Sequence, residues 1–328
     1  MSCSCWLLSI GILAAACGGD SDDTPEAEPW TVVTEEQPAA LLSVWASGAN
    51  DVYTVGGDPR NDTGPLVFHY DGTAWTKLDA LERNVDLWAI YGFANGPIFM
   101  GGANGTILKY ENGTFTKQVT PGNLIVFGIW GASPSDVWAV GGSFGGGHII
   151  WHYDGTTWSD VDAGLSSEDT VWKLNGRATD DVWMTGTTGI ALHWTGAAFT
   201  REDLPVDASL FAVAASEDRF ITVGGAFDGV LFENAGDGWK SAIPTGGALL
   251  NGVAASGDVA FAVGEFGTVL RRGSSGWATD ERVTDQHMHA AFIDPDGGAW
   301  AAGGDFDSTP TKSGVLIHNG EPLQGTIP

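Results

Sequence analysis

Two nearly identical stretches carry the side chains that acid–base chemistry uses. His152 to Trp158 reads HYDGTTW, and His69 to Trp75 reads HYDGTAW. An imidazole, a carboxylate, hydroxyls and an indole could together move a proton between a substrate and the protein. When the repeats of the chain are aligned, the histidine position also accepts an acid and a cation. It is occupied by His69, Lys109, His152, His193, Glu233, Arg271 and His318. The position therefore requires only a polar side chain, and the Asp-Gly pair after it is typical of a tight hairpin turn.

Patterns that would bind a metal are weak. The stretch DPDGG, Asp294 to Gly298, has two carboxylates but lacks the further oxygen ligands of a calcium loop. His287 and His289 bring two imidazoles together without an evident third ligand. Aspartates recur in one turn of the repeat, where capping of the backbone explains them without a metal. These are Asp51, Asp136, Asp181, Asp258 and Asp296. We expect no metal ion and no cofactor.

No residue is assigned a catalytic role. The chain has no H-E-x-x-H pattern and no phosphate-binding loop. Whether the protein is an enzyme stays open, because acidic loop residues are plentiful and carboxylate pairs cleave glycosidic bonds. A carbohydrate-active hydrolase or lyase would use loop carboxylates such as Asp58, Asp62, Asp305 and Asp307.

The elements that position these residues come from a repeat of about 40 residues. Ser43 to Gly57 (SVWASGANDVYTVGG) recurs as Gly128 to Gly142 (GIWGASPSDVWAVGG), and five weaker copies follow the same outline. Each unit holds four short runs rich in Val, Ile, Trp and Tyr between Gly- and Asp-rich turns, which predicts four β-strands. Seven such units predict an all-β fold, a seven-bladed β-propeller of four-stranded blades. The tryptophan anchor of the first copy is matched at Trp45, Tyr91, Trp130, Asn175, Ala214, Ala254 and Phe292.

A column of aromatic residues that opens the fourth strand predicts how the ring closes. Each of them lies about 15 residues before the next anchor, and counting back from Trp45 places another at Trp30. We therefore expect an N-terminal outer strand in the last blade, so that the propeller spans residues 30–328. The competing outer strand, the C-terminal PLQGTIP, lacks the aromatic residue. The column reads Trp75, Phe115, Trp158, Phe199, Trp239 and Trp277.

A second column lies three residues before each anchor, where the first strand of each blade should enter the central channel. It reads Leu42, Trp88, Phe127, Trp172, Phe211, Asn251 and His289. Aromatic side chains at a channel mouth stack on sugar rings or hold peptide side chains. We therefore predict a ligand face formed by Trp88, Phe127, Trp172, Phe211 and His289. The alternative is that these aromatic residues pack between adjacent blades.

The N-terminus has the pattern of an export signal. Trp6 to Ala16 is apolar and uncharged, and it is too short for a membrane-spanning helix of about 20 residues. We expect residues 1–16 to be a signal peptide and residues 17–29 to be a disordered acidic tether. The stretch LAAAC, Leu13 to Cys17, resembles the lipobox of bacterial lipoproteins, and that resemblance implies that Cys17 carries lipid.

The repeat itself resembles the kelch repeat, in which a diglycine ends the second strand, a tyrosine lies on the third and a tryptophan opens the fourth. The matching residues are Gly56, Gly57, Tyr70 and Trp75, then Gly141, Gly142, Tyr153 and Trp158. Together with the lipobox, they make the chain similar to bacterial kelch-like and BNR-like propeller lipoproteins. A resemblance of fold does not carry a function with it.

Charge narrows the class of partner. The 328-residue chain has 14 Lys and Arg against 41 Asp and Glu, a net charge of −27. This argues against nucleic acid and against docking on anionic lipid. We expect a monomer, anchored by its lipid to the outer membrane or cell surface, that binds a protein or glycan without catalysis. A secreted or periplasmic protein is an alternative location, and a subunit of an outer-membrane assembly complex is an alternative function.

Overall fold

The computed structural model describes residues 29–243 and 246–328. The predicted signal peptide and the lipidation site Cys17 lie outside the described residues, as does the predicted tether except for its last residue. Within the described ranges the chain forms strands β1 to β28 and three short 3-10 turns. No helix there is long and apolar enough to cross a membrane.

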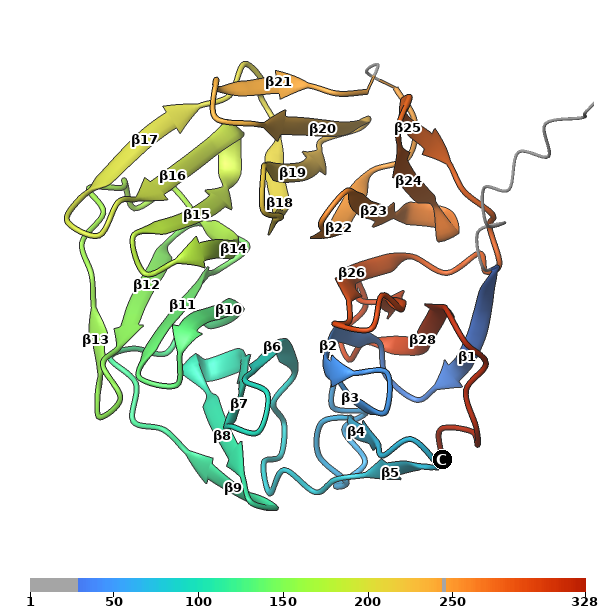
Figure 1. The fold of residues 1–328 in the computed structure, drawn as a ribbon. Coiled ribbons are helices and arrows are strands. Elements are labelled where there is room, and N and C mark those ends of the chain that lie inside the picture. The colour runs from blue at the N-terminus through green and yellow to red at the C-terminus, as the bar shows by residue number, and fades with distance from the viewer. Residues whose placement is uncertain (1–28, 244–245) are drawn as a thin grey trace, which may run out of the picture.

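Seven antiparallel sheets of four strands surround a central axis, as Figure 1 shows. The predicted seven-bladed propeller is therefore confirmed. We number the blades from β2 onward and call the strands of each blade A to D, from the axis outward. The A strands are β2 (Leu41–Gly48), β6 (Leu87–Gly92), β10 (Ile125–Ser133), β14 (Val171–Ala178), β18 (Ser209–Ala215), β22 (Leu250–Ser256) and β26 (Met288–Ile293).

The B strands are β3 (Asp51–Gly56), β7 (Ile98–Gly102), β11 (Asp136–Gly142), β15 (Asp181–Gly186), β19 (Phe220–Gly225), β23 (Val259–Gly264) and β27 (Ala299–Asp305). The C strands are β4 (Val67–Tyr70), β8 (Ile107–Glu111), β12 (His148–Tyr153), β16 (Ile190–Trp194), β20 (Gly229–Asn234), β24 (Val269–Gly273) and β28 (Lys312–Asn319). The D strands are β5 (Trp75–Lys77), β9 (Thr114–Lys117), β13 (Trp158–Asp160), β17 (Phe199–Asp203), β21 (Trp239–Ser241), β25 (Gly276–Thr279) and β1 (Trp30–Gln37). The 3-10 turns are η1 (Ala103–Gly105), η2 (Thr187–Gly189) and η3 (Glu265–Gly267).

The ring is closed by the N-terminal strand, as the aromatic column predicted. β1 pairs antiparallel with β28, with Trp30 opposite Asn319, so that the two ends of the fold share blade 7. Blade 7 therefore has four strands, as the other six blades have. The C-terminal segment makes no strand; its Leu323 and Ile327 pack in the core between blades 1 and 7.

The aromatic column of the D strands joins neighbouring blades. Trp158 meets Phe99 of the preceding blade edge to face at 6.1 Å between ring centroids. Trp30 meets Phe261 in the same way at 5.3 Å. Such pairs contribute about 0.5–1.5 kcal/mol each beyond the area they bury. The column is therefore part of the core that holds the blades together.

Candidate ligand-binding site at the channel mouth

The HYDGT stretches are hairpin turns. The Asp154 carboxylate accepts hydrogen bonds from the backbone N–H groups of Thr156 and Thr157, both at 2.8 Å. These backbone hydrogen bonds lower the pKa of Asp154 to about 2. Gly155 has a φ of 93°, which only glycine adopts without strain. Asp71 caps its own hairpin in the same way. The prediction of a turn in place of an acid–base site is confirmed.

The histidines of the C strands also have structural partners. In three blades the imidazole lies 2.7–2.8 Å from an aspartate at the start of strand B and against an aromatic ring of that strand. Three of the recurring aspartates are thus histidine partners, which differs from the backbone caps that we expected. The pairs are His69 with Asp51, His152 with Asp136, and His193 with Asp181.

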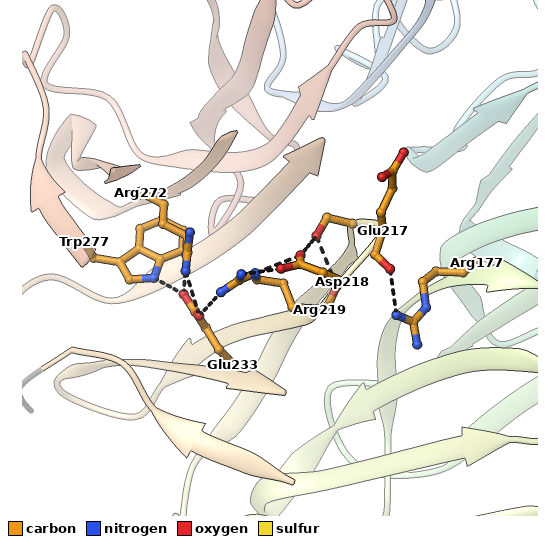
Figure 2. A network of polar contacts seen from close by, with 8 residues as sticks. Arg177, Glu217, Asp218, Arg219, Glu233, Arg272 and Trp277 are labelled. Atoms are coloured by element: carbon orange, nitrogen blue, oxygen red, sulfur yellow. Dashed lines mark hydrogen bonds and ion pairs between the residues drawn. The ribbon is translucent and has the colours of Figure 1, made fainter. Parts of the chain in front are cut away.

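Blade 5 replaces the histidine with an acid, and the contacts change accordingly. Glu233 accepts hydrogen bonds from Arg219 of its own blade, and from Arg272 and Trp277 of blade 6, at 2.7–3.0 Å (Figure 2). Burial alone would raise the pKa of Glu233, but the three hydrogen bonds outweigh it and hold the pKa below its usual range. This network joins blades 5 and 6, and the Glu233 carboxylate is occupied by its protein partners.

The second column has a different geometry. In every blade the column residue is a β-bulge, skipped in the pairing of strand A with strand B. A bulge bends its strand and re-aims the side chain. The seven bulged residues are Leu42, Trp88, Phe127, Trp172, Phe211, Asn251 and His289. The seven predicted positions thus share one local conformation, near the start of strand A in each blade.

The repeated glycine of strand B makes room for each bulge. A Cβ atom on Gly141 would lie 1.8 Å from the carbonyl oxygen of Ile125, two residues before Phe127. One glycine of every other blade has the same close approach, at 1.9–2.2 Å. The other six are Gly56, Gly102, Gly186, Gly224, Gly264 and Gly303. The repeat therefore needs this glycine for close packing.

Six of the seven bulged side chains, all but Leu42, line a cavity of about 300 Å³. All five predicted face residues, Trp88, Phe127, Trp172, Phe211 and His289, line it. The ring centroids of Phe127 lie 5.4 Å from Trp88 and 5.2 Å from Trp172, so the aromatic residues form one continuous wall. Their role in binding stays a prediction. The rest of the lining is Phe144, Lys173, Leu249, Asn251, Glu265, His287, Phe306 and Asp307.

Two nitrogen-bearing side chains form the floor of the cavity. Lys173 Nζ donates to the backbone carbonyls of Trp88 and Phe127, which belong to other blades. His289 Nδ1 lies 2.6 Å from the carbonyl oxygen of Leu42. Burial lowers the pKa of Lys173 to about 8. Burial, and then the charge of Lys173, lower the pKa of His289 to about 3, so His289 is neutral at physiological pH.

The sequence predictions missed Lys173 and Glu265. A signal for Lys173 exists in the sequence, at the position that follows the column residue. Six repeats place a small residue there, and only blade 4 has a long one: the series is Ser43, Ala89, Gly128, Lys173, Ala212, Gly252 and Ala290. Glu265 carries no such signal, because it opens the turn η3 at the end of strand B, where the repeats differ in length.

The four loop carboxylates named for a hydrolase are not brought together as a set. Asp58 is buried and accepts hydrogen bonds from the backbone N–H groups of Arg60 and Asn84. Hydrogen bonding to Ser308 holds the pKa of Asp305 below its usual range, opposite to the shift that a general acid needs. Asp62 has a φ of 67° in an exposed loop, and only Asp307 lines the cavity.

A serine pattern and the metal candidates are also accounted for by local contacts. Gly141 to Gly145 matches G-x-S-x-G, but the Ser143 hydroxyl donates to the carbonyl of Gly146 in its own loop. Asp294 is buried and accepts hydrogen bonds from the backbone of its own turn and from Trp300. The described residues contain no group of three His, Cys, Asp or Glu side chains placed to hold a metal.

Comparison with known proteins supports the fold and goes no further. No protein-family model and no curated protein matches the sequence. Among solved structures, YCF48 bound to D1 peptide is similar at a TM-score of 0.65 and 13% identity, over 90% of this chain and 98% of that one. The extracellular domain of a putative one-component system from B. thetaiotaomicron gives 0.65 and 14%, over 89% and 40%. A GH74 xyloglucanase from Xanthomonas campestris gives 0.62 and 16%, over 84% and 53%.

Proposed function

We propose that the chain is a lipid-anchored, extracytoplasmic binding scaffold that takes a protein or glycan ligand at the mouth of its central channel. The observation that carries this proposal is the cavity of about 300 Å³ walled by the bulged aromatic residues. A concave, largely aromatic pocket with a few polar groups suits a ligand with an apolar or cyclic part. We also propose a kelch-like repeat type, on the basis of the diglycine, tyrosine and tryptophan of blades 1 and 3.

The position of β1 supports a defined orientation for an anchored protein. Trp30 pairs with Asn319, the last residue of a C strand, so the chain joins the ring on the face of the A–B and C–D turns. The cavity lies on the opposite face, among the D–A and B–C loops. From Cys17 to Trp30 the chain reaches at most about 45 Å. In our proposal the cavity is therefore directed away from the membrane.

Capture from intact cells tests the binding function. Cells that produce the full chain are crosslinked, and captured proteins and glycans are compared between the unchanged chain, Trp172→Ala and Phe227→Ser. Phe227 lies on a B–C loop and is 96% exposed, but it does not line the cavity. A ligand of the cavity is lost with Trp172→Ala and kept with Phe227→Ser. Equal capture by all three chains contradicts the proposed site.

Cell fractionation tests the anchor separately. Cys17→Ala should move the protein from the membrane fraction to the soluble fraction, whereas a protein with a plain secretory signal is soluble in both forms. A membrane association that survives Cys17→Ala contradicts a lipid anchor at this residue. An assembly-complex subunit would retain membrane-protein partners in the capture experiment above.

The hydrolase alternative has one supporting observation. Glu265 and Asp307 both line the cavity, so two carboxylates face the same space. The purified chain, screened on polysaccharides, should show no turnover under our proposal. Turnover that is abolished by Glu265→Gln or Asp307→Asn would favour the enzyme over the scaffold.

A further inference from the structure

The floor of the cavity holds a cation at a place where the repeat otherwise has a small side chain. The residue after each bulge lies close to the axis, where strands A of neighbouring blades approach each other. A Cβ atom on Gly128 would lie 3.1 Å from the Cα atom of Lys173, and one on Gly252 would lie 2.9 Å from that of Ala290. Only blade 4 places a long side chain at this position, and Lys173 reaches the backbone carbonyls of blades 2 and 3.

This ammonium group has no acidic partner within the described residues. None of the described carboxylates forms an ion pair with Lys173. Its two hydrogen bonds go to the neutral carbonyls of Trp88 and Phe127. An ammonium group has three N–H donors, so one remains. A buried charge without a counter-charge is costly, and burial lowers the pKa of Lys173 to about 8. An anion that reached Lys173 would remove much of that cost.

One further side chain at the floor offers a donor. The Trp172 indole Nε1–H is buried and has no hydrogen-bond partner in the described part of the chain. His289 is neutral and donates its Nδ1–H to the carbonyl oxygen of Leu42, so its other ring nitrogen is an acceptor and offers no donor to an anion. The two acids that line the cavity, Glu265 and Asp307, belong to the B–C loops at its rim. The cavity thus has N–H donors at its base, aromatic walls, and negative charge at its entrance.

We propose that this cavity binds the C-terminal residue of a partner polypeptide, with the α-carboxylate on Lys173 and Trp172 and a bulky apolar side chain against the aromatic wall. The inference rests on the proposed binding function and selects a protein as its ligand. A chain end brings a carboxylate and an apolar side chain together, whereas an internal residue brings only one of them. Lys173 lies between this cavity and the space below it in the channel, so a chain end that enters from the mouth brings its carboxylate to the ammonium group.

The size and polarity of the cavity favour a peptide end over a sugar. A volume of about 300 Å³ is at the lower limit of ligand pockets, so it holds one residue. A sugar acid would also bring several hydroxyl groups, and most of the wall is aromatic carbon without partners for them. Glu265 and Asp307 at the rim favour basic residues just before the C-terminus, through complementary charge.

Two peptide libraries test the inference on the unchanged protein. Position-scanning hexapeptides with a free C-terminal carboxylate are compared with the same hexapeptides as C-terminal amides, by competition for binding to the full chain. We expect selection of Phe, Leu or Trp at the last position, and about tenfold to hundredfold weaker binding of the amides. Equal binding of acids and amides overturns the inference. Peptides that fail to bind at all also overturn it.

Lys173→Met supplies the matched variant, with its fold checked by circular dichroism. In this variant the difference between acids and amides should vanish. If Lys173→Met does not fold, the acid–amide comparison on the unchanged chain still decides. The proposed function fails separately: if neither library binds but Trp172→Ala still loses a ligand captured from cells, the scaffold stands and only the peptide end is wrong.

Discussion

The two faces of the ring use the same repeat in opposite ways. On the face of the A–B and C–D turns, blades 1 and 3 make the same hairpins and the same histidine–aspartate contacts. On the cavity face, the backbone is equally regular, with a bulge in every A strand, but the bulged side chains range from Leu42 to Trp172 and His289. On this face the backbone conformation is the same in all seven blades, and the side chain at the bulge differs between them.

This difference distinguishes residues that stabilise the blades from residues that line the cavity. Where a repeated position keeps one residue type, its hydrogen-bonding groups bind neighbouring residues of the fold and are not available to a ligand. Where the backbone is constant and the side chain varies, folding does not dictate the side chain. Such positions carry function more readily, as loops do on a rigid scaffold.

The largest effect should come from the glycine that packs beside each bulge on the cavity face. A Cβ atom in Gly141→Ala would meet the Ile125 carbonyl at 1.8 Å, so the bulge at Phe127 must shift. We expect a loss of about 3 kcal/mol or more in the free energy of unfolding, measured by urea denaturation. The control is Gly145→Ala, where a Cβ atom has nothing within 4 Å, and it should change stability by less than about 0.5 kcal/mol.

A smaller loss is expected from the ion network of blades 5 and 6. Glu233→Gln leaves Arg219 and Arg272 without the carboxylate that joins the two blades (Figure 2). The free energy of unfolding should fall by about 2 kcal/mol, because Arg272 loses its counter-charge in a largely buried place, whereas Arg219 keeps Asp218. Asp237→Asn removes an exposed partner of Lys240 and should have no measurable effect. Similar losses in both variants would show that this network adds little.

The architecture could be predicted from the sequence because it repeats. The aromatic column needed only spacing, and it placed the closing strand at Trp30 correctly. The histidine partners could not be predicted, because the contact of His152 with Asp136 spans two strands and depends on their register. Lys173 was missed for another reason: its role comes from the closed ring, where its side chain meets carbonyls of blades 2 and 3. Such contacts follow from tertiary geometry.

The pH dependence of the free energy of unfolding tests the buried histidine of the closing blade. His318 is buried against Trp300, and burial lowers its pKa to about 4. A histidine with a lowered pKa stabilises the fold fully above its unfolded pKa of about 6.5, and that stability is lost as the pH falls toward its folded pKa. We expect His318 to contribute a loss of about 1 kcal/mol between neutral pH and about pH 5.5, in addition to the loss from buried His289. His318→Asn should reduce this dependence by the share of His318 and leave that of His289, and an unchanged slope would contradict the assignment.

The smallest effect on stability should accompany a clear effect on binding. Phe144 is 71% exposed, yet it lies 5.4 Å from Phe127 and 6.0 Å from Trp172 between ring centroids, at the edge of the cavity wall. Phe144→Ser removes little buried area, so the free energy of unfolding should change by less than about 0.5 kcal/mol. Capture of the cavity ligand should nevertheless weaken, because one side of the aromatic wall is gone.

Phe227→Ser is the matched control, since both phenylalanines lie on B–C loops and only Phe144 lines the cavity. It should leave stability and capture unchanged. If Phe144→Ser destabilises the ring as much as it weakens capture, then the aromatic wall is packing core. If Phe227→Ser weakens capture equally, the ligand covers the whole loop face and the cavity is only its centre. Reduced capture by Phe144→Ser alone, at constant stability, would assign the varied side chains of this face to binding.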